Sequence, residues 1–334
     1  MKAWQFSSAV GGVEHNLFRP ASGAPKPKPS DNEILVEVYS MALNPADYKV
    51  PELGMVSKLV VPSPSIPGMD FCGKVVELGA KVDWASVGET VFGSMISKIG
   101  QGSLGQYVAI NKENCAVLPE GVAIDDAAGI GCVGLTAYQS IQPYVKDGDK
   151  VFINGGSGGT GVWSIQIAKT LGCHVTTSCS TANVDLCKHL GADEVLDYKS
   201  VDLVQSLKEK GQVFSLVVDN VGSPSNLYQA SHNFLKPQGR FVQVGMGLGF
   251  GAARQLASSL LIPGFLGGGK RPYSVTLVKT RSDELSKLGT WVKEGKVKAI
   301  TDSSFEYDEA PKAFEKLKTG RAKGKIVIHV SNPK

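Results

Sequence analysis

The chain has 334 residues, of which 42% are hydrophobic and 20% charged, and a formal net charge of +4. This length allows two domains with separate cores, and the composition is that of an ordinary globular protein. The charges are spread without a basic run, which argues against nucleic-acid binding, and no stretch has the pattern of a membrane span. Six cysteines without a paired spacing and a first segment unlike a signal peptide predict reduced thiols and a cytoplasmic location.

Short strand patterns fill residues 1–122. The runs are separated by turn residues and lie at 34–39, 73–78, 90–92 and 106–110. Because no helix pattern alternates with these runs, they predict a small, partly open β-barrel.

A polar cluster follows the first of these strands. Asn44 and Pro45 have the sequence of a helix N-cap and its N1 residue, which by itself would explain both. The same short segment also carries the side chains of Asp47, Tyr48 and Lys49. Functional residues are often found on loops that a rigid scaffold positions, so a cap and a functional site both stay open as interpretations.

Strand and helix patterns alternate over residues 123–277. The run 150–154 predicts a buried strand, which leads through the glycine-rich loop 155–161 into a helix over 162–171. Two further strands and a second helix follow, at 174–178, 194–196 and 184–190. Such alternation predicts an α/β fold with a doubly wound parallel sheet of the Rossmann type.

The glycine-rich loop matches a dinucleotide-binding pattern. Gly156, Gly158 and Gly161 fit G-x-G-x-x-G, which allows a tight turn, close approach of the backbone to a pyrophosphate, and close packing of helix on strand. Phosphates bound there would face the positive end of the helix. The predicted cofactor contacts in the loop are Gly156, Ser157, Gly158, Gly159, Thr160 and Gly161.

A second motif overlaps the same loop. The elbow G-x-S-x-G of serine hydrolases fits with Ser157 at its centre, and Asp219 with His232 or His329 would supply the other members of a triad. That interpretation leaves Gly161 and the second strand–helix unit without a role. A serine hydrolase with Ser157 as nucleophile is therefore an alternative function.

The last part of the chain contains a helix over 282–294 and a closing strand over 326–330 that is expected to return to the first domain. Before it, residues 271–278 have the pattern of an edge strand of the nucleotide-binding sheet.

Several segments together resemble the medium-chain dehydrogenase/reductase superfamily over essentially the full length. Besides the glycine-rich loop they are 44–49, 67–79, 134–138, 190–193 and 324–327. The resemblance implies a GroES-like catalytic domain at 1–122, a Rossmann domain at 123–277, and a segment at 278–334 that returns to the catalytic domain. In this family the edge strand pairs across a two-fold axis, which implies a homodimer.

Zinc-dependent members of the superfamily carry a cysteine near the position of Pro45 and Gly-His-Glu where this chain has Gly68, Met69 and Asp70. The four-cysteine zinc lobe expected between about 90 and 115 is also missing. Since zinc needs Cys, His or carboxylate ligands, the chain resembles the zinc-independent quinone oxidoreductase branch, close to fungal enoyl-reductase-like and reticulon-interacting-protein-like members. Without a metal the hydride acceptor must itself be electrophilic, as quinones and α,β-unsaturated carbonyls are.

The resemblance also implies roles for individual residues. Tyr48 and Lys49 are the candidate donors to the substrate oxygen that gains charge, and Asn44 would position the nicotinamide or its ribose. Further cofactor contacts are implied for Thr136, Val221, Gly245, Met246 and Lys325.

The end of the second strand bears on the choice of cofactor. NAD-preferring sites place Asp or Glu there to bind the ribose diol, whereas residues 177–183 contain no carboxylate. Ser180, Asn183 and Tyr198 match phosphate-binding positions of NADPH-using relatives, which favours NADPH. Those relatives commonly have lysine at the position of Asn183, for which Lys188 is a candidate substitute.

The sequence thus predicts a cytoplasmic, zinc-independent, NADPH-dependent oxidoreductase that transfers hydride to a quinone or an α,β-unsaturated carbonyl. The predicted partners are a small-molecule substrate and a second copy of the chain, with no metal, nucleic acid or membrane span. A non-catalytic NADPH-binding protein on the same fold is the alternative from another class.

Overall fold

The computed structural model describes residues 1–96, 98, 100–245 and 269–333. The chain divides into two compact units, residues 1–135 with 279–334 and residues 136–278. The domain boundaries expected at residues 122 and 277 stay a prediction. No described helix combines the length and the apolar character that a membrane span requires.

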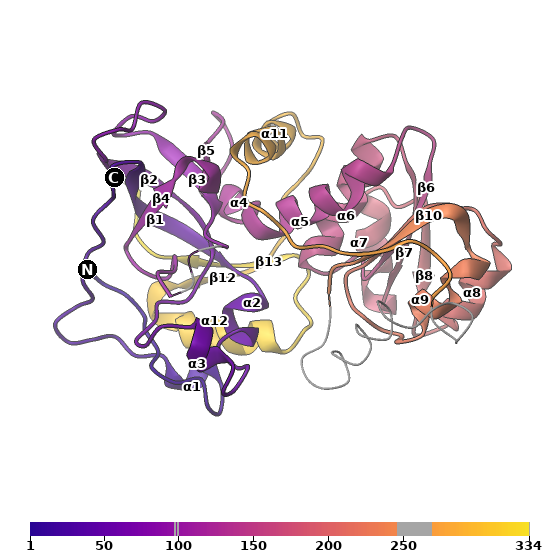
Figure 1. Cartoon of the computed structure of the whole chain (residues 1–334), viewed down its shortest axis with the longest axis horizontal. Coiled ribbons are helices and arrows are strands. Elements are labelled where there is room, and N and C mark those ends of the chain that lie inside the picture. The colour runs from indigo at the N-terminus through magenta and orange to yellow at the C-terminus, as the bar shows by residue number, and fades with distance from the viewer. Residues whose placement is uncertain (97, 99, 246–268, 334) are drawn as a thin grey trace. The chain divides into compact units, whose positions relative to one another are not determined.

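The first unit is built on a seven-stranded sheet in the order β12-β13-β1-β2-β3-β5, with β4 also paired to β1 (Figure 1). Its strands are β1 (Glu33–Leu43), β2 (Asp70–Leu78), β3 (Thr90–Ser94), β4 (Tyr107–Asn111), β5 (Cys115–Val117), β12 (Thr301–Glu306) and β13 (Lys325–His329). Only β12 and β13 pair in parallel, and the other neighbours are antiparallel. The strands expected in residues 1–122 are therefore confirmed as β1 to β4.

The closing strand β13 returns to the first strand, as the sequence predicts. Ser40 to Leu43 of β1 pair with Ile326 to His329 of β13. The helix α12 (Ala310–Lys318) covers this region with Ala310, Ala313 and Phe314, whose helical spacing puts them on one buried face. This pairing brings residues near the end of the chain beside the segment that follows β1.

The remaining elements of the first unit are short helices around the sheet. They are α1 (Val13–Asn16), α2 (Ala46–Lys49), α3 (Ser57–Val60), η1 (Lys112–Asn114), α4 (Ile124–Ala128), α11 (Ser282–Lys293), η6 (Tyr307–Glu309) and α12 (Ala310–Lys318).

The second unit contains a six-stranded parallel sheet in the order β11-β10-β9-β6-β7-β8 (Figure 1). Its strands are β6 (Lys150–Asn154), β7 (His174–Cys179), β8 (Glu194–Asp197), β9 (Phe214–Asp219), β10 (Leu235–Gln243) and β11 (Tyr273–Val275). Read from β6, this is the Rossmann order, and the predicted doubly wound sheet is confirmed. The direction of winding changes between β6 and β9, where such sheets bind ligands beyond the carboxyl ends of the strands.

The helices of this unit either precede the first strand of the sheet or connect its parallel strands. They are α5 (Gly131–Ile141), which begins in the first unit, η2 (Gln142–Tyr144), α6 (Gly159–Thr170), η3 (Thr181–Asn183), α7 (Val184–His189), α8 (Leu203–Glu209), α9 (Leu227–Ala230) and η4 (Ser231–Asn233). β6 and β9 are buried almost throughout, which explains their continuous apolar sequences. Within the described residues β11 is an edge strand of this sheet, as predicted, and β8 is the other.

Candidate cofactor site and catalytic segment

The glycine-rich loop between β6 and α6 is tightly folded. A Cβ at Gly156 would collide with Thr177 Oγ1, and a Cβ at Gly161 would collide with the carbonyl oxygen of Gly155. Gly158 differs, because a Cβ there would meet only the Gly155 oxygen, at 3.7 Å. Packing therefore requires glycine at 156 and 161, whereas Gly158 borders the open space that a phosphate cradle needs.

The loop leads into the N-terminus of α6. Gly158 is the N-cap residue, and no side chain caps this helix. The first N–H groups of a helix have no partner within it, and the helix dipole makes this end positive. Residues 161–168 are all buried, so the helix is held firmly in place. These N–H groups suit the phosphates of a dinucleotide.

Polar side chains at the end of β7 join the same loop. The amide nitrogen of Asn183 donates to Ser157 Oγ at 3.0 Å and to Ser180 Oγ at 3.2 Å. Asn183 Oδ1 is buried and has no hydrogen-bond partner among the described residues. The predicted cofactor contacts Ser157, Ser180 and Asn183 thus lie together. Asn183 Oδ1 can accept a hydrogen bond from a donor such as a ribose hydroxyl.

Tyr198 and Lys199 follow β8. The Tyr198 side chain is exposed, and the Lys199 ammonium lies 5.6 Å from the centre of its ring. Asp197 connects this turn to the loop after β7, since it accepts hydrogen bonds from Thr181 Oγ1 at 2.6 Å and from the Lys199 backbone N–H at 3.0 Å. The sequence analysis missed Lys199, a candidate cation here, and named Lys188, which is exposed on α7.

Asp219 organises the loop after β9. Its Oδ1 accepts hydrogen bonds from Asn154 Nδ2 at 2.8 Å and from the backbone N–H groups of Val221 at 3.0 Å and Gly222 at 2.9 Å. Burial raises the pKa of this carboxyl, and the hydrogen bonds oppose the rise. Val221 lies against the glycine-rich loop, where a Cβ at Gly155 would collide with its side chain.

Asn220, at the carboxyl end of β9, is a candidate that the sequence analysis missed. Both polar atoms of its side chain are buried without a hydrogen-bond partner among the described residues. A Cβ on Gly155 would lie 3.8 Å from the Asn220 Cβ, so this side chain starts beside the loop.

Gly245 approaches the Asn220 carbonyl so closely that a Cβ would collide with it, and the predicted contact Met246 lies outside the described residues. Thr136, also predicted, is buried on α5.

Together these residues fit a nicotinamide dinucleotide. Within the described residues, the space at Gly158, the end of α6 without a side-chain cap, and the polar atoms of Asn183 and Asn220 have no protein partner. They follow β6, β7 and β9, which are neighbours at the ligand-binding edge of the sheet. An unpaired amide has both a donor and an acceptor, as a ribose diol requires.

The segment 44–49 in the first unit corrects one expectation. The N-cap of α2 is Pro45, and no side chain caps that helix. Asn44 Nδ2 donates instead to Asp70 Oδ2 at 2.8 Å, and Asn44 Oδ1 accepts from Lys325 Nζ at 2.7 Å. The N-cap interpretation of Asn44 is therefore wrong, because buried charged groups take both ends of its amide.

Lys325 and Asp70 form a buried ion pair, with exposed fractions of 2% and 0% and a nitrogen–oxygen distance of 3.0 Å. Lys325 Nζ also donates to the Leu43 carbonyl at 2.9 Å, so with Asn44 its three N–H groups are all used. Asp70 Oδ1 accepts from the Cys132 N–H at 2.7 Å. Nothing in the local sequence marked Asp70 as a member of this cluster. The cofactor contact of Lys325 stays a prediction, and it would require displacement of one of these bonds.

Asp47 adds a second carboxylate to the same cluster. It is buried, and it accepts a hydrogen bond from the Asn44 backbone N–H at 2.7 Å. Burial raises the pKa of Asp47 to about 7, and the charge of Asp70 contributes to the rise. The Lys325 ammonium is therefore the cation for two buried carboxyl groups, those of Asp70 and Asp47.

Tyr48 and Lys49 are both partly buried. The Tyr48 ring packs against the core of the first unit, while its hydroxyl has no hydrogen-bond partner in the part of the chain that the structure describes. Burial raises the pKa of Tyr48, so the phenol stays protonated and able to donate at neutral pH. Burial lowers the pKa of Lys49.

Ser157 has the surroundings of a cofactor loop more than those of a nucleophile. Its hydroxyl accepts from Asn183, whereas His329 binds Asp125 and Glu306, and the His232 ring binds the Gln229 carbonyl. In the described ranges no three His, Cys, Asp or Glu side chains gather as a possible metal site. Zinc independence is not settled by that observation and stays a prediction.

A Rossmann sheet with a glycine cradle, in a chain that also holds a GroES-like β unit, defines a nicotinamide-dependent oxidoreductase. Residues 30–120 match the family of the alcohol dehydrogenase GroES-like domain, and residues 190–328 match that of the zinc-binding dehydrogenase. The trans-enoyl reductase pgmF of Aspergillus terreus is 45% identical over 99% of this chain and 96% of its own length. The 2-methylene-furan-3-one reductase of Solanum lycopersicum is 30% identical over 98% of this chain and 79% of its own. The structure of the quinone oxidoreductase from Coxiella burnetii has 30% identity and a TM-score of 0.85, over 99% of both chains.

The chain therefore belongs to the medium-chain dehydrogenase/reductase superfamily, in its quinone oxidoreductase-like branch. This confirms the resemblance and the fold class that the sequence predicts. The family consists of oxidoreductases that bind nicotinamide cofactors, and the comparisons give the serine-hydrolase alternative no support.

Proposed function

We propose that this oxidoreductase uses NADPH, needs no zinc, and transfers hydride to an α,β-unsaturated carbonyl or a quinone. The observation that carries the proposal is the acid-free end of β7, where Ser157, Ser180 and Asn183 are hydrogen-bonded beside the glycine cradle. The serine hydroxyls can donate to a 2′-phosphate, whereas a carboxylate there would repel it. Lys199 adds a cation that offsets the charge of Asp197.

Zinc independence is proposed from the residues at the positions that bind zinc in metal-dependent relatives. Pro45 offers no ligand atom in its side chain, and Met69 offers only a thioether. Asp70 is bound to Lys325 and Asn44. Because no metal would polarise the substrate, an acceptor whose conjugation spreads the developing charge suits this site best.

When bound, the cofactor supplies the hydride. The α6 N-terminus would hold its phosphates, and Asn220 and Asn183 would bind ribose hydroxyls. The Tyr48 hydroxyl, which has no partner among the described residues, is the proposed donor to the substrate oxygen. Such a donor stabilises the negative charge that develops on this oxygen as hydride arrives, and Lys49 is the proposed second donor.

The test is an NADPH-consumption screen with enones, quinones, aldehydes and alcohols, before and after dialysis against a chelator. We expect turnover with enones or quinones that survives dialysis. Tyr48→Phe should lower kcat by about 10- to 100-fold and leave NADPH affinity unchanged. NADPH binding without turnover of any acceptor would favour the non-catalytic alternative, and activity lost with bound zinc would refute zinc independence.

The cofactor preference has its own test. Ser180→Asp should weaken NADPH binding and favour NADH, because it adds a carboxylate where a 2′-phosphate would lie. Gln238→Asp, exposed near the start of β10 and away from the carboxyl ends of the strands, is the control for added charge. Equal affinity of the wild-type protein for both cofactors in a binding titration would contradict the proposal.

We also propose a homodimer that pairs through the edge strand β11, and a cytoplasmic location. The support for the dimer is the place of β11 at an edge of the described sheet, since an edge strand is where a second copy can pair. Light scattering of the purified protein tests the dimer, and Val275→Pro, whose N–H lies on the side of β11 away from β10, should give monomers.

A further inference from the structure

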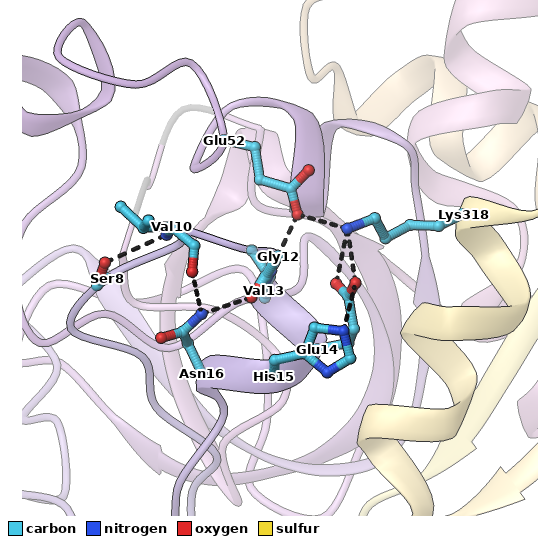
Figure 2. A network of polar contacts seen from close by, with 9 residues as sticks. All are labelled: Ser8, Val10, Gly12, Val13, Glu14, His15, Asn16, Glu52 and Lys318. Carbon is cyan, nitrogen blue, oxygen red and sulfur yellow. Dashed lines mark hydrogen bonds and ion pairs between the residues drawn. The ribbon is translucent and has the colours of Figure 1, made fainter.

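Three segments that are far apart in the sequence meet at Lys318 (Figure 2). Its ammonium group donates to Glu14 Oε1 at 2.7 Å and Oε2 at 2.8 Å, and to Glu52 Oε1 at 3.0 Å. Glu52 Oε1 also accepts from the Val13 backbone N–H, at 2.9 Å, where α1 begins. Lys318 is the last residue of α12, and a cation is favourable at that end of a helix. The cluster thus joins α1, α12 and the loop after α2.

This cluster is more than an exposed ion pair. The side chains of Glu14, Glu52 and Lys318 are exposed by 8%, 20% and 26%. Partly buried charges are screened less by solvent than charges at the surface. Gly12 fits closely here as well, because a Cβ on it would collide with the Glu14 carboxylate. His15, largely exposed, lies 3.6 Å from Glu14.

The cluster touches the turn that carries Tyr48. The Glu52 backbone N–H donates to the Tyr48 carbonyl at 3.0 Å, and the Lys318 ammonium lies 5.7 Å from the centre of the Tyr48 ring. Tyr48 therefore has a cation over its ring and the Glu52 carboxylate close by. Neither charged group bonds to the Tyr48 hydroxyl, which has no partner among the described residues.

We infer that Lys318 and Glu52 are positioning residues for Tyr48: they hold its turn against α1 and α12 and set the balance of charge around its phenol. The inference rests on the proposed role of Tyr48 as the donor to the substrate. The two residues act on this phenol in opposite directions. The Lys318 charge lowers the pKa of Tyr48, the Glu52 charge raises it, and burial makes the largest contribution, which also raises it.

The first experiment measures the Tyr48 phenol itself. A pH titration of ¹³C-labelled tyrosine by NMR, with Tyr48→Phe to assign the signal, should show a higher Tyr48 pKa in Lys318→Met and a lower one in Glu52→Gln. Lys316→Met is the matched control, since Lys316 lies on the same helix and pairs with Asp302 instead. A purely structural role for the cluster would not move the pKa in opposite directions. An unchanged pKa in both folded variants would overturn the inference.

The second experiment separates positioning from a direct role. Lys318→Met should lower kcat with an enone by about tenfold and change KM for NADPH little, since a displaced donor loses transition-state stabilisation. Lys318→Arg, which keeps the charge, should restore most of the rate. In a Tyr48→Phe background Lys318→Met should have no further effect, whereas multiplicative losses would show that Lys318 acts independently of Tyr48 and would overturn the inference. A wild-type protein without any turnover would refute the proposed function, and the NMR titration would still test the positioning.

Discussion

The cofactor cradle and the charged cluster around Lys325 are built in different ways. In residues 136–278 the cradle is formed by consecutive residues of β6, the glycine-rich loop and α6. It depends on backbone groups and on glycines, which have no side chain to fill the space. In the other unit, Asn44 meets Asp70 and Lys325 across 26 and 281 residues of sequence, because β1 pairs with both β2 and β13. Substitutions in the cradle should therefore mainly impair cofactor binding, while substitutions in the charged cluster should mainly impair folding.

The largest effect is expected for Lys325→Met. The substitution leaves Asp47 and Asp70 buried without a cation, and breaking a buried pair in this way costs about 3–5 kcal/mol. Chemical denaturation should show this loss in the free energy of unfolding. Lys323→Met, two residues away and exposed, is the control and should change stability by less than about 0.5 kcal/mol. If the Lys325→Met variant instead has wild-type stability and binds NADPH more weakly, the charged cluster serves cofactor binding rather than folding.

A smaller effect is expected for Asp47→Asn, and it depends on pH. Because the pKa of Asp47 is raised to about 7 in the folded protein, the folded state binds more protons than the unfolded state between about pH 4 and 7. The wild type should therefore lose about 2–3 kcal/mol of stability from this group between pH 5 and 8, and the variant should not. The measurement is the difference in free energy of unfolding between the two proteins at several pH values. A constant difference would contradict the raised pKa.

The glycine-rich loop offers a pair of substitutions with opposite outcomes. Gly161→Ala should lower stability by about 1–3 kcal/mol, because its Cβ collides with the Gly155 carbonyl. Gly158→Ala meets only one atom, at 3.7 Å, and should leave stability unchanged or slightly higher. In NADPH titrations Gly158→Ala should nevertheless bind about tenfold more weakly, because its Cβ enters the cradle. Equal affinity of this variant and the wild type would show that Gly158 does not border the cofactor.

The cradle could be predicted from sequence because its signal is local. Strand, glycine spacing and helix occur within about two dozen residues, and each glycine has a backbone reason that the pattern records. Even here the helix begins at Gly159, before the predicted start at 162, since glycines of the loop form its first turn.

The charged cluster could not be predicted in the same way. Asn44 has the local sequence of an N-cap, but two tertiary hydrogen bonds outcompete that role. Asp70 gave no signal beyond its place in the family pattern, since its partner Lys325 is 255 residues away. Likewise Lys318 meets Glu14 across 304 residues. Only the register of β1 with its neighbours and the packing of α12 bring these side chains together.

The smallest expected effect concerns Asn220, a cradle candidate that no sequence pattern indicated. If the Asn220 amide serves the cofactor, Asn220→Ala should change the stability of the cofactor-free protein by less than about 0.5 kcal/mol, since this amide makes no hydrogen bond to a described residue. The same variant should bind NADPH about five- to tenfold more weakly by titration, and NADPH should raise its Tm less than that of the wild type.

The matched control is Asn154→Ala, whose amide bonds to Asp219, Ser178 and Ser223. Its removal should cost about 1–3 kcal/mol without cofactor, because it leaves these groups unpaired. If instead Asn220→Ala destabilises the cofactor-free protein as much as Asn154→Ala does and leaves NADPH affinity unchanged, then Asn220 serves the fold. In that case the cradle would depend on its backbone alone, and the contrast with the charged cluster would be sharper still.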